Sequence, residues 1–503
     1  SSKTLARAPA SISTDCSLSF STSSNMLART VQCFLLMGSR VFQQSMRQAL
    51  PGLLIFMSPE LGLSISQKGT LLSAVAFGYF FTQVPGGALA DRVGAKNMIT
   101  AAMTLSACCC MAIPTCAAYF GVTGIWMVIA LMGAVQGPLF PTSFVHLSRW
   151  LPRRTPGGRD EKAWGAEMLD IGVSVGSAII VPVTNYLSQT LGWRHAYHII
   201  GAFSLLFVLT WMVLGAESPS TCSYITPEEL KFISENLGTP APPKPTACKA
   251  EEEPKDEPNA KEKRTSRSSS PAPTRKQAAS PAAGRSTGMP LRLWFHPSLW
   301  AIFTAHMAFN YGGYFQSSFS PMYYNEVLHL TTDQSKYHLM IPFCANLVMK
   351  VLNPILNDIV LHFGFSLLSA RRIFTAVGFL SAGVAFLPIY HIRALNPWFS
   401  TTLFIINCAC IGLAPNGFKS NYLDVTEKYV GVVSGAGNSL ATLSSWASPL
   451  FVTYILKNFE GRWDLVHISL FVMNILASLN FVLCSTTTPI EKGYELEKAK
   501  KEQ

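Results

Sequence analysis

Apolar stretches of about 20 residues, the length at which a helix crosses a bilayer, recur along the whole of this chain. Because lipid offers the backbone no hydrogen bonds, stretches of this kind are expected to be helical. The composition also favours lipid as the solvent, since 49% of the 503 residues are hydrophobic, only 13% are charged and the mean hydropathy is +0.28. We therefore predict an all-α integral membrane protein embedded in a lipid bilayer.

The stretches predict about twelve transmembrane helices in two bundles of about six. The expected spans are residues 30–57, 69–89, 98–118, 123–147, 164–188, 195–215, 298–322, 337–361, 373–391, 398–418, 431–456 and 463–485. The two bundles would then cover residues 29–216 and 289–486.

Three segments lie outside these bundles. The serine-rich residues 1–28 are expected to be a disordered tail, with an organelle-targeting peptide as the alternative. Residues 217–288 form a linker whose part from 238 onward is too rich in Pro, Ser, Lys and Glu to bury a core. In ITPEELKFISENL, at 225–237, Thr226 can cap a short surface helix with acids in its first turn. Residues 487–503 form a C-terminal tail.

The net charge of +11 follows membrane topology and gives no reason to expect a nucleic-acid partner. One set of alternate loops carries most of the basic residues, and the opposite loops carry few. The richer set holds Arg92, Lys96, Arg149, Arg153, Arg154, Arg159, Lys162, Arg371 and Arg372, and the poorer set holds Lys68, Arg194 and Arg393. By the positive-inside rule, both termini are expected in the cytoplasm.

The 12 cysteines mostly fall inside expected spans, where thiols act as small apolar packing groups. Their spacing resembles no zinc site, so no metal is expected. The chain also shows no nucleophile with a paired base and no phosphate-cradling loop, and hence no sign of an enzyme.

A glycine-rich motif follows the second span, where residues 81–96 read FTQVPGGALADRVGAK. Gly87 and Gly94 permit tight turns and close helix approach, while Asp91 is placed to face the positive end of another helix. We expect these residues and Arg92 to form a gate. The eighth span ends similarly, with Asp358 followed by basic residues, and this weak repeat suits a transporter built of two similar halves around a central site.

Arg47 lies in the apolar run MRQALPGLLIFM, where a charge costs roughly 3 kcal/mol or more unless it meets water or a partner. A phosphate or carboxylate would satisfy its planar donors. The alternatives are a structural ion pair and an arginine that reaches the interface. Arg40, two turns earlier, is expected near that interface.

Several other polar residues in the spans are candidates for substrate contact or for packing. Gln136 can position a solute but cannot carry a proton, and a packing hydrogen bond is its alternative. Asn310 and Tyr311 are expected to line the cavity. Glu167 and Asp170 favour a gate or structural network with nearby arginines over ion coupling. Lys350 either binds an anion or pairs with Asp358.

The motif GGALADRVGAK resembles the loop between helices two and three of the major facilitator superfamily, and FGYFFTQVPGGALADR is similar to its anion:cation symporter branch. That branch includes vesicular glutamate transporters, sialin, and sodium-phosphate and plastid phosphate transporters. Further similarity lies in GAVQGPLFPTSFVHLSRWLP at 133–152, GWRHAYHIIG at 192–201, PMYYNEVL at 321–328 and GFKSNYLDVTEKYVGVVSGAGNS at 417–439.

The resemblance places Arg47 on an arginine that the branch carries in its first helix. Gln136 stands where many members have a glutamate, Ile129 where some have an arginine, and Phe309 at another basic position. Asn310 matches plastid-type members.

The resemblance implies a secondary transporter that moves a small anion, inorganic phosphate or an organic carboxylate, by rocking two bundles around a central site. No cofactor is expected, and coupling to Na⁺ or H⁺ is implied by the resemblance alone. The plasma membrane, a vesicle or a plastid is each a possible location. The alternative function is a membrane sensor or scaffold that keeps the fold without moving a solute.

Overall fold

The computed structural model describes residues 28–152, 160–237, 289–388 and 396–495. Within these residues the long elements are all helices. They are α1 (Ala28–Leu61), α2 (Ile65–Val93), α3 (Ala95–Gln136), α4 (Leu139–Trp150), α5 (Glu161–Leu191), α6 (Trp193–Leu214), η1 (Pro219–Thr221), α7 (Pro227–Leu237), α8 (Leu291–Trp294), α9 (Pro297–Ser318), α10 (Ser320–Glu326), α11 (Thr332–His362), α12 (Leu367–Phe386), α14 (Pro397–Phe418), α15 (Tyr422–Val425), α16 (Val430–Asn458) and α17 (Trp463–Cys484).

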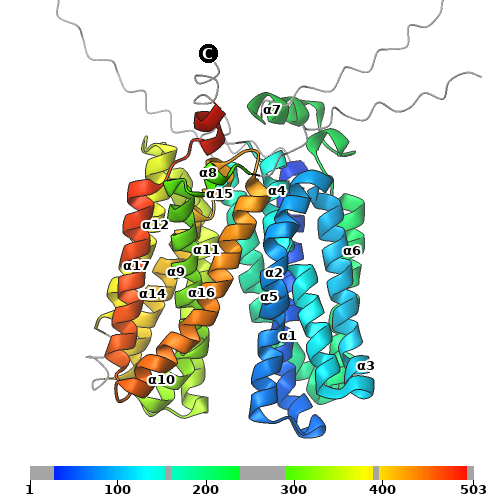
Figure 1. The fold of residues 1–503 in the computed structure, drawn as a ribbon, viewed down its shortest axis with the longest axis vertical. Coiled ribbons are helices and arrows are strands. Elements are labelled where there is room, and N and C mark those ends of the chain that lie inside the picture. The colour runs from blue at the N-terminus through cyan, green and yellow to red at the C-terminus, as the bar shows by residue number, and fades with distance from the viewer. Residues whose placement is uncertain (1–27, 153–159, 238–288, 389–395, 496–503) are drawn as a thin grey trace, which may run out of the picture.

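Two groups of long helices stand side by side (Figure 1). Helices α1 to α6 form one group, the N-bundle, and the helices from α9 to α17 form the other, the C-bundle. Helices α7 and α8 and the end of the described chain lie at one end of the pair, which we call the linker face (Figure 1). Between the bundles, α2 and α4 pack on α16, and α5 packs on α11 and α14. These contacts place the functional candidates.

Helices cover the expected spans, and eight stretches of the described residues are both long and apolar enough to cross a membrane. Helix α1 is not among them because Arg40, Gln43 and Arg47 lower its hydropathy, although it is helical throughout. The all-helical membrane fold is therefore confirmed. The residues that weaken the apolar signal of α1 are those that lie between the bundles.

Two boundaries need comment. Helix α3 is interrupted at Gly121, where φ is +59°, and this turn separates the expected spans 98–118 and 123–147. The expected span 373–391 is wrong in its position, because α12 begins at Leu367 and ends at Phe386. Its start is set by Ser366, whose hydroxyl accepts a hydrogen bond from the backbone of Ser369 at 3.1 Å, a cap that hydropathy does not register.

The internal repeat extends to the way helices begin. Helix α2 starts with a capping box between Ser64 and Gln67, and α11 starts with the same arrangement between Thr331 and Gln334. These helices occupy equivalent places in the two bundles. Their other ends carry Asp91 and Asp358, the two residues on which the repeat was predicted.

The predicted helix after the N-bundle is confirmed as α7, with the hydroxyl of Thr226 accepting from the backbone of Glu229 at 3.2 Å. This helix is more than a surface element. The buried carboxylate of Glu229 accepts from the backbone N–H groups of Ala28 at 2.9 Å and Arg29 at 3.2 Å, so α7 caps the first turn of α1.

The expected C-terminal tail begins as an ordered segment, since residues 490–495 are helical. The buried Glu491 accepts from the backbone of Glu427 at 2.6 Å and of Lys428 at 3.0 Å, which fixes this segment to the C-bundle. The predictions for residues 1–27, 238–288 and 496–503 fall outside the described residues.

Candidate functional site

Charged and amide side chains lie buried where the two bundles meet. Each is at most 7% exposed, and together we call them the polar layer: Arg40, Gln43, Gln136, Glu167, Asp170, Lys350, Asn353 and Lys419. Removing ionised groups from water is costly unless they find partners. The partners of each residue therefore show what the layer can do.

The strongest link across the layer joins Asp170 of α5 to Lys419, which follows α14. The ammonium of Lys419 lies 2.7 Å from both carboxylate oxygens of Asp170. The same ammonium is 4.4 Å from the ring centroid of Phe309, so a cation stands beside the position where the branch carries a basic residue on its seventh helix. The network predicted at Asp170 exists, but its partner is a lysine of the other bundle and not an arginine of the loop 149–162.

A second link joins Glu167 of α5 to Asn353 of α11, whose amide nitrogen donates to Glu167 Oε1 at 2.8 Å. Lys350, one turn before Asn353, donates to the hydroxyl of Ser174 at 3.0 Å. The expected alternative in which Lys350 pairs with Asp358 is wrong. The two residues are about two turns apart on one helix, and the side chain of Lys350 extends across to the N-bundle instead.

The N-bundle contributes Arg40, Gln43 and Gln136. Arg40 donates to the amide oxygen of Gln43, and the amide nitrogen of Gln43 donates to the backbone oxygen of Gln136 at 3.4 Å. Arg40 was expected near the membrane interface but is only 7% exposed, because α1 packs closely against α5 there. Both amide atoms of Gln136 are buried and have no hydrogen-bond partner within the described chain.

Arg47 lies one turn beyond Gln43 on the same side of α1 and is half-buried. Its guanidinium is 4.6 Å from the ring centroid of Tyr79 on α2. The hydroxyl of Tyr79 in turn accepts from the amide of Asn438 on α16 at 2.9 Å. Arg47 thus adjoins a contact between the bundles, and within the described residues it forms no ion pair with a carboxylate.

Asn310 and Tyr311 do not share one environment. Tyr311 is buried in the C-bundle, where its hydroxyl lies 3.4 Å from that of Ser469 on α17. Asn310 is half-buried on the neighbouring side of α9. Because successive helix residues point about 100° apart, the pair cannot line one narrow surface together. The structure does not bring the Tyr311 hydroxyl to the polar layer, which differs from the expectation that it lines the cavity.

The predicted gate residues lie at the linker face, and Asp91 faces the positive end of a helix as expected. Its carboxylate accepts from the backbone N–H of Gly431 at 3.0 Å and of Val432 at 3.2 Å, in the first turn of α16. Gly87 makes this approach possible, since a Cβ there would lie 2.1 Å from the backbone oxygen of Gly431. Arg92, the next residue after Asp91, is exposed.

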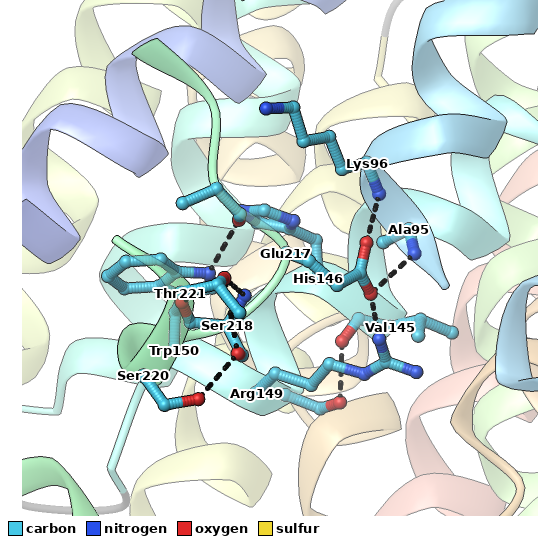
Figure 2. Close-up of polar contacts among 12 residues, drawn as sticks. Ala95, Lys96, Val145, His146, Arg149, Trp150, Glu217, Ser218, Ser220 and Thr221 are labelled. Carbon is cyan, nitrogen blue, oxygen red and sulfur yellow. Dashed lines mark hydrogen bonds and ion pairs between the residues drawn. The ribbon is translucent and has the colours of Figure 1, made fainter. Parts of the chain in front are cut away.

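Gly94 forms the turn between α2 and α3 with φ of +109°, a conformation that favours glycine. Glu217 occupies the space where a side chain would stand (Figure 2). Its carboxylate accepts from the backbone of Ala95 at 2.9 Å and of Lys96 at 2.7 Å and also pairs with Arg149 (Figure 2). The gate motif is thus held to α4 and to the start of the linker by one carboxylate.

The second half of the gate mirrors the first. Asp358, at the end of α11, accepts from the backbone N–H of Asp160, which caps α5. The carboxylate of Asp160 accepts from the guanidinium of Arg371 at 2.6 Å, and Arg371 also contacts Asp424 at 3.0 Å. Arg371 and Asp160 were predicted only as part of a basic loop and a helix start. The structure makes them a buried ion pair between the bundles.

Comparison with known proteins places this architecture in a family. The family model described as Major Facilitator Superfamily matches residues 33–449. The chain belongs to this superfamily. The predicted resemblance, the multi-pass membrane fold and the assignment as a secondary transporter and not an enzyme are thereby confirmed.

Relatives within the superfamily support the predicted branch. Sialin from Ovis aries is 23% identical over 418 residues, which cover 83% of this chain and 74% of that protein. The chloroplastic sodium-dependent phosphate transport protein 1 from Arabidopsis thaliana is 23% identical over 413 residues, with 81% and 69% covered. The chloroplastic ascorbate transporter of the same plant is 23% identical over 409 residues, with 81% and 66% covered.

Solved structures of superfamily members show the same fold. The proton:xylose symporter XylE superposes with a TM-score of 0.65 at 13% identity, covering 93% of this chain and 98% of that one. The E. coli fucose:proton symporter FucP gives a TM-score of 0.57 at 12% identity, with 90% and 98% covered. At these identities the likeness shows the fold alone.

Proposed function

We propose that this protein moves a small anion, inorganic phosphate or an organic carboxylate, across the membrane by alternating access, coupled to a cation. The observation that carries the proposal is the environment of Arg47. Its guanidinium is half-buried, packs on the Tyr79 ring and has no carboxylate to neutralise it in the described part of the chain. A charge at this depth is costly unless it serves a ligand or meets water.

The charges of the polar layer support an anion as that ligand. The layer contains three bases, Arg40, Lys350 and Lys419, and two acids, Glu167 and Asp170. With all of them ionised, it carries an excess of positive charge before Arg47 is added. Because opposite charges attract strongly where water is scarce, a small anion is the solute that this site would favour.

We assign alternating access to the contacts at the linker face. The Asp91, Asp358 and Arg371 contacts all join the bundles there, and the ribbons of the bundles diverge toward the other end (Figure 1). Contacts of this kind must form in one state and break in the other. We place the linker face in the cytoplasm, from the distribution of basic loops, and assign the gate to Gly87, Asp91, Arg92, Gly94 and Asp358.

Uptake into proteoliposomes tests the proposal. The purified protein would be reconstituted and offered labelled phosphate and a panel of labelled carboxylates, with and without Na⁺ and pH gradients. We expect uptake of at least one anion, abolished by Arg47→Ala. The matched control is Arg194→Ala, because Arg194 is an exposed arginine paired with Glu60 away from the polar layer.

The outcome also separates transport from the sensor or scaffold alternative. A folded, correctly inserted protein that moves none of these anions would favour the alternative. Uptake that Arg47→Ala leaves unchanged would remove Arg47 from the site while leaving transport in place.

A further inference from the structure

Glu167 is a buried carboxylate that uses half of its capacity for hydrogen bonds. It is 1% exposed and lies on α5, facing the C-bundle. Its Oε1 accepts from the amide nitrogen of Asn353 at 2.8 Å, while its Oε2 is buried and has no hydrogen-bond partner within the described residues. A fully ionised carboxylate normally accepts several hydrogen bonds.

The charged groups that face Glu167 come from three elements. Asp170 lies one turn away on α5, Lys350 faces it from α11, and Lys419 faces it from the end of α14. Both basic groups already have other partners, since Lys419 holds both oxygens of Asp170 and Lys350 donates to Ser174. Neither ammonium donates a hydrogen bond to Glu167. A buried carboxylate in this position is far less costly in its neutral form.

We propose that Glu167 is the proton-binding residue of this transporter and couples proton movement to anion movement. The inference rests on the proposed function and names its coupling ion. In the observed state, with the linker face closed, Glu167 holds a proton on one of its oxygens. When the bundles part at the linker face, Asn353 moves away, water reaches the carboxyl group, and the proton leaves to that side as the carboxylate forms.

The same proton adjusts the affinity for the anion. A proton on Glu167 removes one negative charge from the polar layer, which leaves Arg40, Lys350 and Lys419 opposed by Asp170 alone. The anion and the proton therefore favour each other's binding, and the coupling is reciprocal by thermodynamic necessity. Gln136, whose side chain is neutral, cannot take this role.

The geometry favours a proton over Na⁺ as the coupled ion. The group nearest to Glu167 is the nitrogen side of the Asn353 amide, which donates and so cannot ligate a cation. Lys350 and Lys419 would also repel Na⁺ at short range. Within the described residues, no group of three or more acidic, histidine or cysteine side chains could hold a metal ion.

Infrared difference spectroscopy of the full chain in lipid bilayers tests the proton directly and needs no substrate. We expect the wild-type protein to show the carbonyl stretch of a protonated carboxyl group near neutral pH, and Glu167→Gln to lose it. Glu235→Gln, which changes an exposed glutamate of α7, should retain the band. A wild-type spectrum without the band, or a band that survives in Glu167→Gln, would overturn the proposal.

Transport supplies a second readout that separates this inference from the proposed function. Glutamine keeps an oxygen that can accept from Asn353 and imitates the protonated form, so Glu167→Gln should fold. We expect this variant to exchange labelled phosphate across the membrane while losing accumulation driven by a pH gradient, whereas Arg47→Ala loses both. Gradient-driven accumulation at the wild-type level in Glu167→Gln would contradict proton coupling through Glu167. If wild-type protein does not move phosphate, that arm of the proposed function fails and the infrared result still decides the role of Glu167.

Discussion

The guanidinium of Arg371 lies 2.6 Å from the carboxylate of Asp160, and this ion pair joins the two bundles although neither side chain is more than 1% exposed. Arg371 lies on α12 of the C-bundle, and Asp160 caps α5 of the N-bundle. The pair stands at the linker face, beside the contact between Asp358 and the backbone of Asp160. It is therefore a structural element of the closed gate.

Replacing Arg371 should be strongly destabilising. Arg371→Met would leave Asp160 and Asp424 buried without their shared cation, and breaking a buried pair in this way costs about 3–5 kcal/mol. We expect a clear fall in the melting temperature of the detergent-solubilised protein. Arg462→Met is the matched control, because Arg462 pairs with Asp464 at an exposed position. Equal melting temperatures for the two variants would contradict a structural role for Arg371.

The gate can be biased at Asp91. Asp91→Asn removes the negative charge that caps α16 at Gly431 and Val432, and the loss of a helix cap is worth about 0.5–2 kcal/mol. We expect the population to shift toward the state open at the linker face. A cysteine introduced at the buried Ser434, in a background without native cysteines, should then react faster with a thiol reagent added from that side. Unchanged reactivity would count against gating by Asp91.

Close packing at Gly87 is a separate requirement of the gate. Gly87→Ala would place a methyl group 2.1 Å from the backbone oxygen of Gly431, so the two helices must separate. Overpacking of this kind costs about 1–3 kcal/mol. We expect slower uptake together with faster labelling from the linker face. Gly313→Ala is the control, since no atom lies within 4 Å of the Cβ position there.

The ion pair between Asp170 and Lys419 should behave as a unit. Asp170→Asn or Lys419→Gln alone leaves one buried charge without its partner, at a cost of about 3–5 kcal/mol. The double variant should lose less stability than the two single losses combined, by about 0.5–3 kcal/mol, because it leaves neither charge unpaired. A double-mutant cycle on thermal unfolding measures this coupling. Strictly additive losses would show that the two side chains do not interact.

Much of the architecture was predictable because the bilayer imposes it. The repeated apolar stretches required helices, Thr226 marked the start of α7, and the acid at the end of the second span faces a helix N-terminus as its position suggested. These features depend on local chemistry or on one dominant solvent.

The pairing of charges across the bundles was not predictable in this way. Arg371 read as one of several loop arginines, and Lys350 was offered a partner on its own helix, whereas both contact residues of α5 or its cap. These partners are about 200 residues away in sequence, and no periodicity links them. Tyr311 likewise needed the orientation of α9 to show that its hydroxyl faces α17.

The sequence by itself thus determined that this chain is a helical membrane protein with two related halves, since hydrophobicity and helix caps act within a few residues of where they are written. Only the tertiary structure decided which buried charges meet, because an ion pair depends on distances of a few ångströms between helices that are far apart in the chain. That is why Arg47 was recognised as a candidate from its neighbours, and why the unshared oxygen of Glu167 became visible only after the bundles were assembled.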